Sequence, residues 1–415
     1  MIIKAPKGTK DVLPQESYKW HHVEQLARKI AALSGYREVR TPVFEHTELF
    51  LRGVGDTTDI VQKEMYTFTD KGERSLTLKP EGTAGVVRAF LEGGLPSSAQ
   101  PTKMYYITPV FRYEKPQSGR LREHHQFGVE VFGAQDASVD AEVINLALTL
   151  LGELGLHDLR LNINSIGCDK CRPQYNEVLK EYLHSNIDSL CESCKQRLEH
   201  NPLRALDCKE EGCQQVVKNA PLMIESLCED CSAHFETLKQ YLGSLGIEYK
   251  VNPLIVRGLD YYTKTVFEII SGSIGAQGTV CGGGRYDKLI KQVGGPDMAG
   301  IGFGMGIERL LLVMENEHIE IECPSVTDVY LCTHGDEARL RAAVLTRDLR
   351  AAGIKADMDH CARSIKAQFK YADKLNVRFT VVLGEDEIKN NTAVLKTMAT
   401  GEERIISQDD IKKFI

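Results

Sequence analysis

The composition of the chain changes abruptly in its middle, and this change constrains the fold more than any other feature. From Cys168 to about Gly246 the sequence has a helical pattern, many charges and many cysteines, with eight of the 12 cysteines between Cys168 and Cys231. The stretches on either side are strand-like, rich in β-branched and aromatic residues and in glycine. Because the strands on each side are short of partners, we predict a helical insertion, residues 168–246, in a β-rich domain made of residues 1–167 and 247–322.

The elements of that β-rich domain can be predicted from periodicity. Apolar residues recur every three or four positions from Glu16 to Leu33, which is typical of a helix, and Gly35 follows as its end. The chain around Pro42, residues 37–50, is expected to be extended. Further strands are expected at residues 75–78, 104–107, 126–132 and 159–166, and further helices at residues 140–151 and 306–317.

The end of the chain predicts a separate domain. A linker at residues 323–325 is followed by alternating strands and helices. This order is typical of a small α/β domain with a largely parallel sheet, which we place at residues 326–415. Its strands are expected at residues 326–333, 354–358 and 379–383, and its helices at 337–352 and 364–375.

Charge and hydropathy exclude some classes of protein. The formal net charge is -7, so the chain is not coated with basic residues, and any RNA partner has to be held by local patches. No apolar run approaches the roughly 20 residues that a membrane span needs. The N-terminus lacks the apolar core and cleavage site of a secretory signal, so we expect a cytoplasmic protein.

One segment carries an arginine between two predicted strands. Phe111-Arg112-Tyr113-Glu114 precedes a polar loop, and the following strand alternates Gln126, Gly128 and Glu130 with apolar residues. The planar guanidinium of an arginine suits a phosphate or a carboxylate, and the alternation gives the strand one polar face. The alternative is an ordinary hairpin with a solvated loop.

Glycine-rich segments occur near Arg309 and Tyr286. The first, residues 302–310, precedes a predicted helix whose N-terminus suits anions and places Arg309 in its first turn. It lacks the Lys-Ser/Thr of a phosphate-binding P-loop, so packing is the alternative. The second is residues 282–287. Together with the segment 257–268 it offers tyrosines, an arginine and an aspartate that could line a small polar pocket. The alternative is two aromatic-rich strands joined by a glycine-rich turn. A fifth segment, residues 78–85, carries a carboxylate at Glu81 and a hydroxyl at Thr83 just after a predicted strand ends. The alternative is that Glu81 only marks the start of a helix.

Together these segments closely resemble the bacterial type of histidyl-tRNA synthetase, a family of class II aminoacyl-tRNA synthetases. Residues 111–130 resemble motif 2 of that class, residues 302–309 resemble motif 3, and the helix from Glu16 with Pro42 resembles motif 1, the dimer element. Residues 257–268 and 282–287 resemble the two signatures of histidine enzymes. The resemblance runs in the same order over nearly the whole chain.

The resemblance implies a fold and an activity. The fold would be α+β, with a six- or seven-stranded antiparallel sheet, flanking helices, the helical insertion and a C-terminal α/β anticodon-binding domain. The chain would be a histidine–tRNA ligase that activates L-histidine with ATP and Mg²⁺ to histidyl-adenylate. It would then transfer histidine to the 3′ end of tRNA(His), releasing AMP and pyrophosphate, and it would act as a homodimer.

The resemblance also implies roles for individual residues. Arg112 and Arg257 would be catalytic, and ATP would be bound by Arg112, Arg309 and Glu114. The residues expected to bind histidine are Glu81, Thr83, Gln126, Glu130, Arg257, Tyr261, Tyr262 and Tyr286.

Contacts to tRNA are expected in two places. Lys115, Arg120 and Arg122 follow motif 2 and would meet the acceptor end of the tRNA. In the C-terminal domain the basic residues recur every four positions, which puts them on one helix face, and they are Lys366, Lys370 and Lys374. A solvated surface is the common alternative for such a face.

The cysteines of the insertion form four close pairs. These pairs are Cys168 and Cys171, Cys191 and Cys194, Cys208 and Cys213, and Cys228 and Cys231. Each pair can bind one side of a metal ion, so two all-thiolate zinc sites are possible. The inserted domain of the family needs no metal, and inert thiols are therefore the alternative.

Two other functions remain to be compared. One is a non-catalytic, synthetase-like regulatory subunit of the ATP phosphoribosyltransferase of histidine biosynthesis, and the other is a class II synthetase for glycine, proline or threonine. The presence of Arg112, Arg257, Arg309 and the C-terminal domain disfavours the first. The two histidine signatures disfavour the second.

Overall fold

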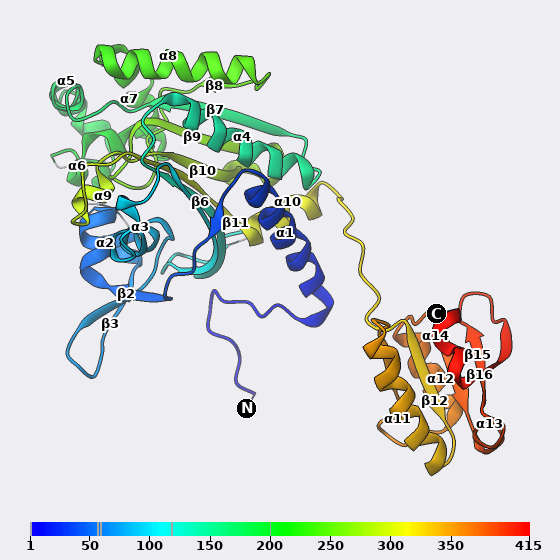
Figure 1. Cartoon of the computed structure of the whole chain (residues 1–415). Helices are drawn as coiled ribbons and strands as arrows, with labels where there is room; N and C mark the ends of the chain where they lie inside the picture. Colours follow the sequence, from blue (N-terminus) through cyan, green and yellow to red (C-terminus); the bar gives the residue numbers. More distant parts are fainter. Residues whose placement is uncertain (1, 56–57, 59, 118, 200) are drawn as a thin grey trace. The chain divides into compact units, whose positions relative to one another are not determined.

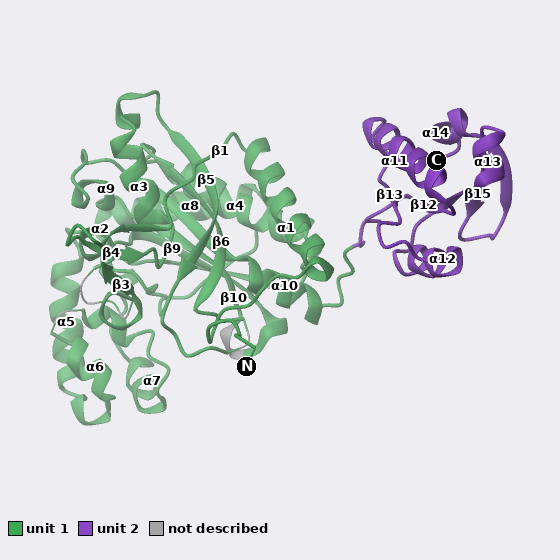
Figure 2. Cartoon of the chain, turned by 90° about the horizontal axis from the view of Figure 1, so that it is seen from below, with its two compact units in different colours: residues 1–321 green, residues 322–415 purple. Residues whose placement is uncertain are grey.

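The computed structural model describes residues 2–55, 58, 60–117, 119–199 and 201–415, which form two compact units. Unit 1 comprises residues 1–321 and unit 2 comprises residues 322–415 (Figure 2). Within the described ranges, no helix has the length and apolar character that a membrane crossing would require.

Unit 1 is built on a sheet of eight strands, β1-β5-β6-β11-β10-β9-β7-β8 (Figure 1). The two edge pairs, β1 with β5 and β7 with β8, are parallel, and the pairs between them are antiparallel. The sheet is thus larger than the six or seven strands that the resemblance implies, because two-residue strands are added at both edges. Its strands are β1 (Arg37–Glu38), β5 (Thr102–Phe111), β6 (Glu123–Phe132), β7 (Leu159–Ser165), β8 (Lys250–Val251), β9 (Thr263–Ser271), β10 (Thr279–Arg285) and β11 (Gly300–Gly306).

Helices α1 (Pro14–Leu33), α4 (Ala137–Glu153) and α10 (Ile307–Asn316) cover one face of this sheet. Their buried side chains, among them Ala27, Ile144 and Leu310, pack in one core with Phe127 and Val129 of β6. The predicted alternation along β6 is therefore confirmed, since its apolar residues face the helices. The polar residues of β6 face the opposite side, where the candidate site lies.

The chain on the other side of the sheet differs in part from its prediction. Residues 37–50 were expected to be extended, but α2 (Thr47–Val54) begins within them. Helix α3 (Thr83–Glu92) then packs Phe90 against Phe132 of the large sheet. A small antiparallel sheet lies beside these helices in the order β2 (Phe44–His46), β4 (Ser75–Leu78), β3 (Tyr66–Thr69), and α9 (Leu289–Gln292) follows β10.

The predicted insertion contains α5 (Arg172–His184), α6 (Glu192–Arg197), α7 (Glu211–Val217) and α8 (Glu229–Ser244), between β7 and β8 in sequence. It has a core of its own, in which Tyr175, Leu179 and Val217 pack with buried cysteines. Helix α8 packs on α4 of the surrounding domain (Figure 1). The insertion stays within unit 1, and the boundary at residues 168–246 remains a prediction.

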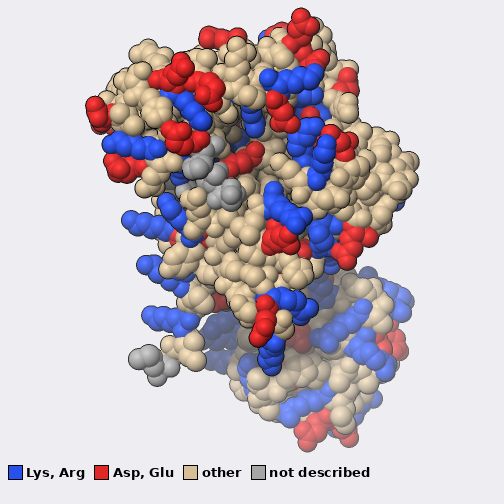
Figure 3. Space-filling view, turned by 90° about the vertical axis from the view of Figure 1, so that its left-hand side faces the viewer, with Lys and Arg blue, Asp and Glu red and all other residues tan. Residues whose placement is uncertain are grey.

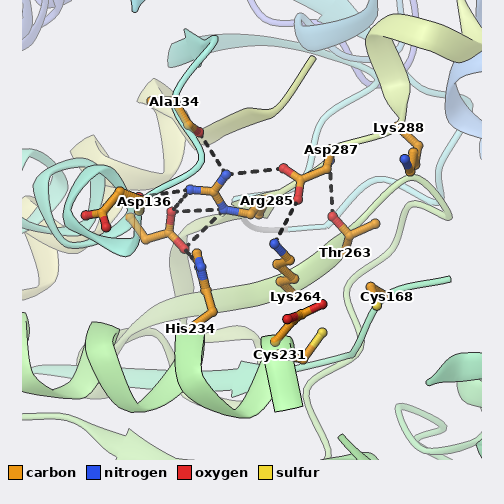
Figure 4. A network of polar contacts seen from close by, with 12 residues as sticks. Ala134, Asp136, Cys168, Cys231, His234, Thr263, Lys264, Arg285, Asp287 and Lys288 are labelled. Atoms are coloured by element: carbon orange, nitrogen blue, oxygen red, sulfur yellow. Dashed lines mark hydrogen bonds and ion pairs between the residues drawn. The ribbon is translucent and has the colours of Figure 1, made fainter. Parts of the chain in front are cut away.

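A buried ionic network joins the insertion to the sheet (Figure 4). Arg285 of β10 has no exposed surface and donates from Nε to Asp140 of α4 at 3.1 Å and from Nη1 to the carbonyl of Ala134 at 2.9 Å. His234 of α8 contacts Asp140 at 2.7 Å. Burial opposes the charge of Asp140, but Arg285 and His234 outweigh it, so the pKa of Asp140 is lowered. Arg285 therefore lies in the core, and the arginine that segments 257–268 and 282–287 supply to a cavity is Arg257.

Unit 2 has a five-stranded sheet in the order β13-β12-β14-β15-β16. The parallel strands are β12 (Val329–Thr333), β13 (Ala356–Met358) and β14 (Phe379–Leu383), accompanied by α11 (Asp336–Ala351) and α12 (Ile365–Lys374) as predicted. The remaining strands, β15 (Thr392–Thr397) and β16 (Glu403–Ser407), pair antiparallel, so the sheet is only partly parallel. They were not predicted because β16 has a single buried residue and its alternation is weak. Short helices α13 (Glu385–Lys389) and α14 (Ile411–Phe414) complete the unit.

Candidate active site

A cavity of about 300 Å³ lies over the face of the large sheet that the helices leave free. Most of the predicted ATP-binding and histidine-binding residues line it together: Glu81, Thr83, Arg112, Glu114, Gln126, Arg257, Tyr261, Tyr262, Tyr286 and Arg309. Arg120 lines it as well. Glu130 lies directly behind the lining, bonded to Thr83 and Tyr286. Side chains from distant parts of the sequence thus meet at one site.

Glycines of β10 and β11 make the room for these side chains. A Cβ atom at Gly302 would lie 2.0 Å from the Glu130 carboxylate, and one at Gly304 would lie 2.2 Å from Nε2 of Gln126. A Cβ at Gly282 would lie 2.0 Å from the Arg257 guanidinium. Gly302 and Gly304 lie within β11, where the lack of a Cβ atom lets neighbouring side chains approach closely. They do not form a phosphate-binding turn. Helix α10 does begin after them, with Arg309 in its first turn as predicted.

One end of the cavity is cationic. Arg112 donates to the carbonyl of Pro80 at 2.7 Å, and Arg309 donates to the carbonyl of Thr279 at 2.7 Å and to that of Gly119 at 3.2 Å. Burial and the neighbouring Arg120 lower the pKa of Arg309. Backbone carbonyls hold both guanidinium groups, and Arg112 also lies 3.9 Å from the Glu114 carboxylate. Arg112 and Arg309 repel each other, so an anion bound between them would lower the free energy of the site.

His124 lies among these arginines and was not predicted as a site residue. Burial, followed by the charges of Arg112 and Arg309, lowers the pKa of His124 to about 3. The imidazole is therefore neutral near pH 7, and it adds no positive charge to the cationic end. Its Nδ1 atom is buried and has no hydrogen-bond partner among the described residues.

Arg257 approaches the cavity from the loop between β8 and β9. Its backbone has a φ of 65°, a conformation that residues other than glycine seldom adopt. Arg204 of the insertion donates to its carbonyl oxygen at 2.6 Å. Its guanidinium is paired with Glu268 of β9, and although burial opposes the charge, this carboxylate raises the pKa of Arg257. Glu268 thus stabilises the charged form of Arg257 and Arg204 holds its backbone, and neither neighbour was predicted.

The other end of the cavity combines a carboxyl group with hydroxyl groups. Glu130 accepts hydrogen bonds from Thr83 at 2.7 Å, from Tyr106 at 3.2 Å and from Tyr286. Burial raises the pKa of Glu130 from 4.5 to about 8. The ring of Tyr261 lies 5.5 Å from that of Tyr286. This end can both donate to and accept from a small polar ring.

Glu81 has a clear local role. Its carboxylate accepts from the backbone N–H of Thr83 at 2.7 Å and from that of Ala84 at 2.8 Å, at the beginning of α3. The interpretation of Glu81 as a helix-start residue is therefore confirmed. Its expected contact with histidine stays a prediction.

The residues expected to contact tRNA are found in three different settings. Arg120 contacts Glu114 at 2.9 Å in the cavity, whereas Lys115 is exposed. Arg122 stacks over the ring of Tyr113 at 3.8 Å, and its backbone N–H donates to Gly8 at 2.7 Å.

On α12 the predicted basic face is exposed and consists of Lys366, Lys370 and Lys374. The opposite side of this helix is buried at Gln368 and Ala372. On the face of the molecule in Figure 3, basic and acidic side chains are mixed, as the net charge of -7 leads one to expect.

Several residues at the site were missed because no local pattern marks them. Glu268 of β9 and Lys209 of the insertion line the cavity, and Tyr106, from the middle of β5, donates to Glu130 behind the lining. Periodicity within β5 indicates that Tyr106 lies on one face, but only its pairing with Gly128 of β6 shows that the ring crosses a bare backbone. Contacts between segments this distant cannot be read from one sequence.

Comparison with known proteins assigns the family. The family model described as histidyl-tRNA synthetase matches residues 8–310, and a second model, described as anticodon binding domain, matches residues 328–415. The chain belongs to the histidyl-tRNA synthetase family. The predicted α+β class II fold, with its C-terminal anticodon-binding domain, is thereby confirmed.

Individual relatives match along their whole length. A histidine–tRNA ligase of Caldanaerobacter subterraneus subsp. tengcongensis is 62% identical over 415 residues, covering 100% of both chains. One of Clostridioides difficile is 57% identical over 407 residues, covering 98% of this chain and 97% of the relative. The crystal structure of apo histidyl-tRNA synthetase from S. aureus is similar with a TM-score of 0.85 and 41% identity, covering 100% of this chain and 99% of that one.

The raised pKa of Glu130 predicts a pH effect on stability. Between pH 4.5 and about 8 the folded protein keeps a proton that the unfolded chain loses, so the free energy of unfolding falls as pH rises through this window. Glu130→Gln removes the titration. We expect the melting temperature of this variant, relative to the original protein, to increase from about pH 5 to about pH 8. Thermal unfolding without ligands measures it, with the exposed Glu153→Gln as control. A difference that stays constant with pH would contradict the assignment.

Proposed function

We propose that this chain is a histidine–tRNA ligase whose chemistry takes place in the cavity over the large sheet. The observation that carries the proposal is the meeting of Arg112, Arg257 and Arg309 in one cavity with a carboxyl and hydroxyl end suited to imidazole. The match of the chain to the family over both units supports the same activity.

In the first reaction the carboxylate of histidine attacks the α-phosphorus of ATP. A carboxylate–phosphorus bond forms, the bond to the β-phosphate oxygen breaks, and pyrophosphate leaves with the electron pair. Two anions have to approach each other, and guanidinium groups fixed beforehand offset their repulsion. We assign Arg112 to the α-phosphate, Arg309 to the γ-phosphate and Arg257 to the space between the α-phosphate and the histidine carboxylate. Hydrogen bonds to the carbonyls of Pro80 and Thr279 support this by holding two of these groups before ATP arrives.

Recognition of histidine is assigned to the other end of the cavity. An imidazole ring in its neutral form has one donor and one acceptor nitrogen, so a selective pocket has to offer both partners. Glu130 and Tyr286 provide them, because a carboxyl group near its pKa and a phenol can each donate or accept. The α-amino and carboxylate groups of histidine are assigned to the remaining predicted residues, which are Glu81, Thr83, Gln126, Tyr261 and Tyr262.

Magnesium accompanies ATP in class II synthetases. This ion prefers phosphate and water oxygens and one or two carboxylates, and when bound it neutralises charge on the phosphates. Glu114 is the carboxylate beside Arg112 and Arg120 in the cavity, and it is the group that we assign to the ATP end. Because Arg120 already contacts Glu114 at 2.9 Å, we assign no protein ligand to the ion itself.

In the second reaction a hydroxyl group of the terminal adenosine of tRNA(His) attacks the adenylate carbonyl. An ester bond forms, the bond between the carbonyl carbon and the phosphate oxygen breaks, and AMP leaves with that electron pair while the hydroxyl proton is released to solvent. We assign Lys115, Arg120 and Arg122 to the acceptor end, since Arg120 lines the cavity and the other two lie on the same loop. The exposed face of α12 is assigned to the anticodon side, where phosphate contacts would position the RNA.

The regulatory-subunit alternative is not favoured. Such a protein needs no triphosphate site, whereas Arg112, Arg257 and Arg309 meet in this cavity. A subunit without RNA would also have no use for residues 328–415, which match the anticodon binding domain.

The three arginines give the most direct test. Arg112→Gln, Arg257→Gln or Arg309→Gln should each lower histidine-dependent exchange of pyrophosphate into ATP by about 10²–10³-fold, because a positive charge that stabilises the transition state is lost. Arg160→Gln, at an exposed position on β7, is the control and should leave the rate unchanged. Absence of exchange in the original protein would favour the regulatory subunit, and exchange with another amino acid would favour another synthetase.

The face of α12 can be tested apart from the chemistry. Lys366→Glu with Lys370→Glu should weaken tRNA(His) binding and lower its salt dependence by about one unit of slope per lost phosphate contact. Pyrophosphate exchange should stay intact, because residues 322–415 form a separate unit. Filter binding at several salt concentrations measures the first effect. Lys389→Glu with Lys412→Glu, exposed on α13 and α14, changes the charge equally and should bind normally. Equal losses of binding and exchange would refute the assignment.

We also propose that the protein is a homodimer. Exposed apolar residues of the motif 1 region support this, among them Phe44 and Leu51, which are 51% and 44% exposed. Phe44 and Phe68 lie side by side with ring centroids 6.3 Å apart. Sedimentation should give twice the chain mass of 46.3 kDa, and Phe44→Asp with Leu51→Asp should shift the protein toward the monomer. Sedimentation of the original protein as a monomer would contradict this proposal.

A further inference from the structure

The eight cysteines of the insertion gather into two clusters of four. The outer cluster joins the first and last pairs, Cys168 and Cys171 with Cys228 and Cys231. The inner cluster joins the two middle pairs, Cys191 and Cys194 with Cys208 and Cys213. Within each cluster all four sulfur atoms lie within 4.8 Å of one another. The pairs are therefore nested along the chain rather than combined in sequence order.

We propose that the insertion holds two structural zinc ions, one in the outer cluster and one in the inner cluster. Zinc in such sites is tetrahedral, with Zn–S distances of about 2.3 Å, so the sulfurs on one edge are about 3.8 Å apart. The Cys168–Cys171, Cys168–Cys228 and Cys171–Cys231 sulfurs are each 3.8 Å apart in the outer cluster. The Cys191–Cys208 sulfurs are 3.8 Å apart in the inner one. The clusters thus have the size of a single ion's coordination shell.

Several of these sulfurs accept hydrogen bonds from backbone N–H groups. In the outer cluster the backbone N–H of Cys168 points at the sulfur of Cys171 at 3.1 Å, and that of Lys170 points at the sulfur of Cys168 at 3.4 Å. In the inner cluster the N–H of Cys191 points at the sulfur of Cys213 at 3.1 Å. Such donors orient and stabilise metal-bound thiolates. When an ion binds four thiols, it displaces their protons. Hydrogen bonds from these N–H groups then stabilise part of the negative charge on the sulfurs.

Helix beginnings add to this effect. Cys171 and Cys228, both in the outer cluster, are the N-cap residues of α5 and α8, which begin at Arg172 and Glu229. The N-terminus of a helix favours a negative charge and lowers the energy of a thiolate. Two helices of the insertion therefore each direct an N-terminus toward the outer cluster.

Disulfides do not explain the clusters. A disulfide holds its two sulfurs about 2.05 Å apart and leaves other thiols out. Here each sulfur has three sulfur neighbours at comparable distances, and all eight cysteines are free. A short helical insertion with a small core is also the kind of structure that gains most from a bound metal.

The outer site joins the first residues of the insertion to the start of its last helix. Cys168 follows β7 at the point where the chain leaves the sheet, and Cys228 begins the helix that returns toward β8. Arg172, next to Cys171, donates to the carbonyls of Ile166 at 3.0 Å and of Tyr262. The ion therefore fixes the segment that supports the backbone of a cavity residue.

The inner site borders the cavity itself. Lys209, which follows Cys208, lines the cavity, and Arg204 on the same segment donates to the carbonyl of Arg257 at 2.6 Å. Asn201 donates to Asp260 on the Arg257 loop at 2.7 Å. If the cavity is the ligase site proposed above, the inner ion holds the groups that keep Arg257 in its strained conformation. The zinc sites themselves do not depend on that activity.

The first experiment needs only the original protein. Elemental analysis after purification without added zinc should give two zinc ions per chain. Alkylation of the denatured, chelator-treated protein without reductant should label all 12 cysteines. Less than about a tenth of an equivalent of zinc would overturn the proposal, given the affinity of structural sites. So would iron in place of zinc, or fewer labelled cysteines, which would indicate disulfides.

Two variants with four serines each test the nested arrangement. Serine at the four outer cysteines should leave one zinc ion per chain. Serine at the first and second pairs should leave none, because each cluster then loses half of its ligands, and these positions are Cys168, Cys171, Cys191 and Cys194. The reverse result would overturn the nesting. Serine at Cys323 and Cys361, which are exposed and outside both clusters, is the control and should keep two ions.

Discussion

The register of the large sheet is the constraint on which the site depends. Gly128 of β6, Gly304 of β11 and Gly282 of β10 lie directly opposite one another across three neighbouring strands. They form a bare strip of backbone, over which Tyr106 lies at one end and Arg257 at the other. A shift by one residue would put Phe127 or Phe303 in this strip, because side chains alternate between faces. The cavity therefore exists only if these long-range strand pairs form in one register.

The arginines of the protein serve two purposes, and the groups that each arginine contacts determine which one it serves. Arg285 is completely buried and is neutralised by Asp140 and other acceptors, so it fixes α4 and α8 to β10 and has no charge to offer a ligand. Removing one partner of such a pair would leave a buried charge uncompensated, at a cost of about 3–5 kcal/mol. Arg112 and Arg309, in contrast, bond to carbonyl groups and stay charged at the edge of a cavity. The same residue type is structural in one place and available to an anion in the other.

Sequence patterns predicted the helices and strand faces that depend on residues close together in the chain. The helices at α1, α4 and α10 and the polar face of β6 follow from periodicity, and the resemblance gathered Arg112, Arg257 and Arg309 correctly into one cavity. No local pattern indicated that Arg285 is buried, because its partner Asp140 lies 145 positions away in the sequence. Strand β16 was missed because this edge strand buries a single residue, and β15, its neighbour in the sheet, was missed with it. Contacts such as Arg204 with Arg257 join residues 53 positions apart and leave no local signal.

The contacts between the insertion and the Arg257 loop give the insertion a structural role. The Arg257 loop has a backbone conformation that costs free energy, of about 1–3 kcal/mol for a residue other than glycine, and it can persist only when its surroundings hold it. The sheet supplies Glu268 from one side, and the insertion supplies Arg204 and Asn201 from the other. A small helical insertion holds such groups firmly only if it is itself rigid. Two metal ions, each tying together cysteine pairs from different segments, would give it that rigidity where its own apolar core is small.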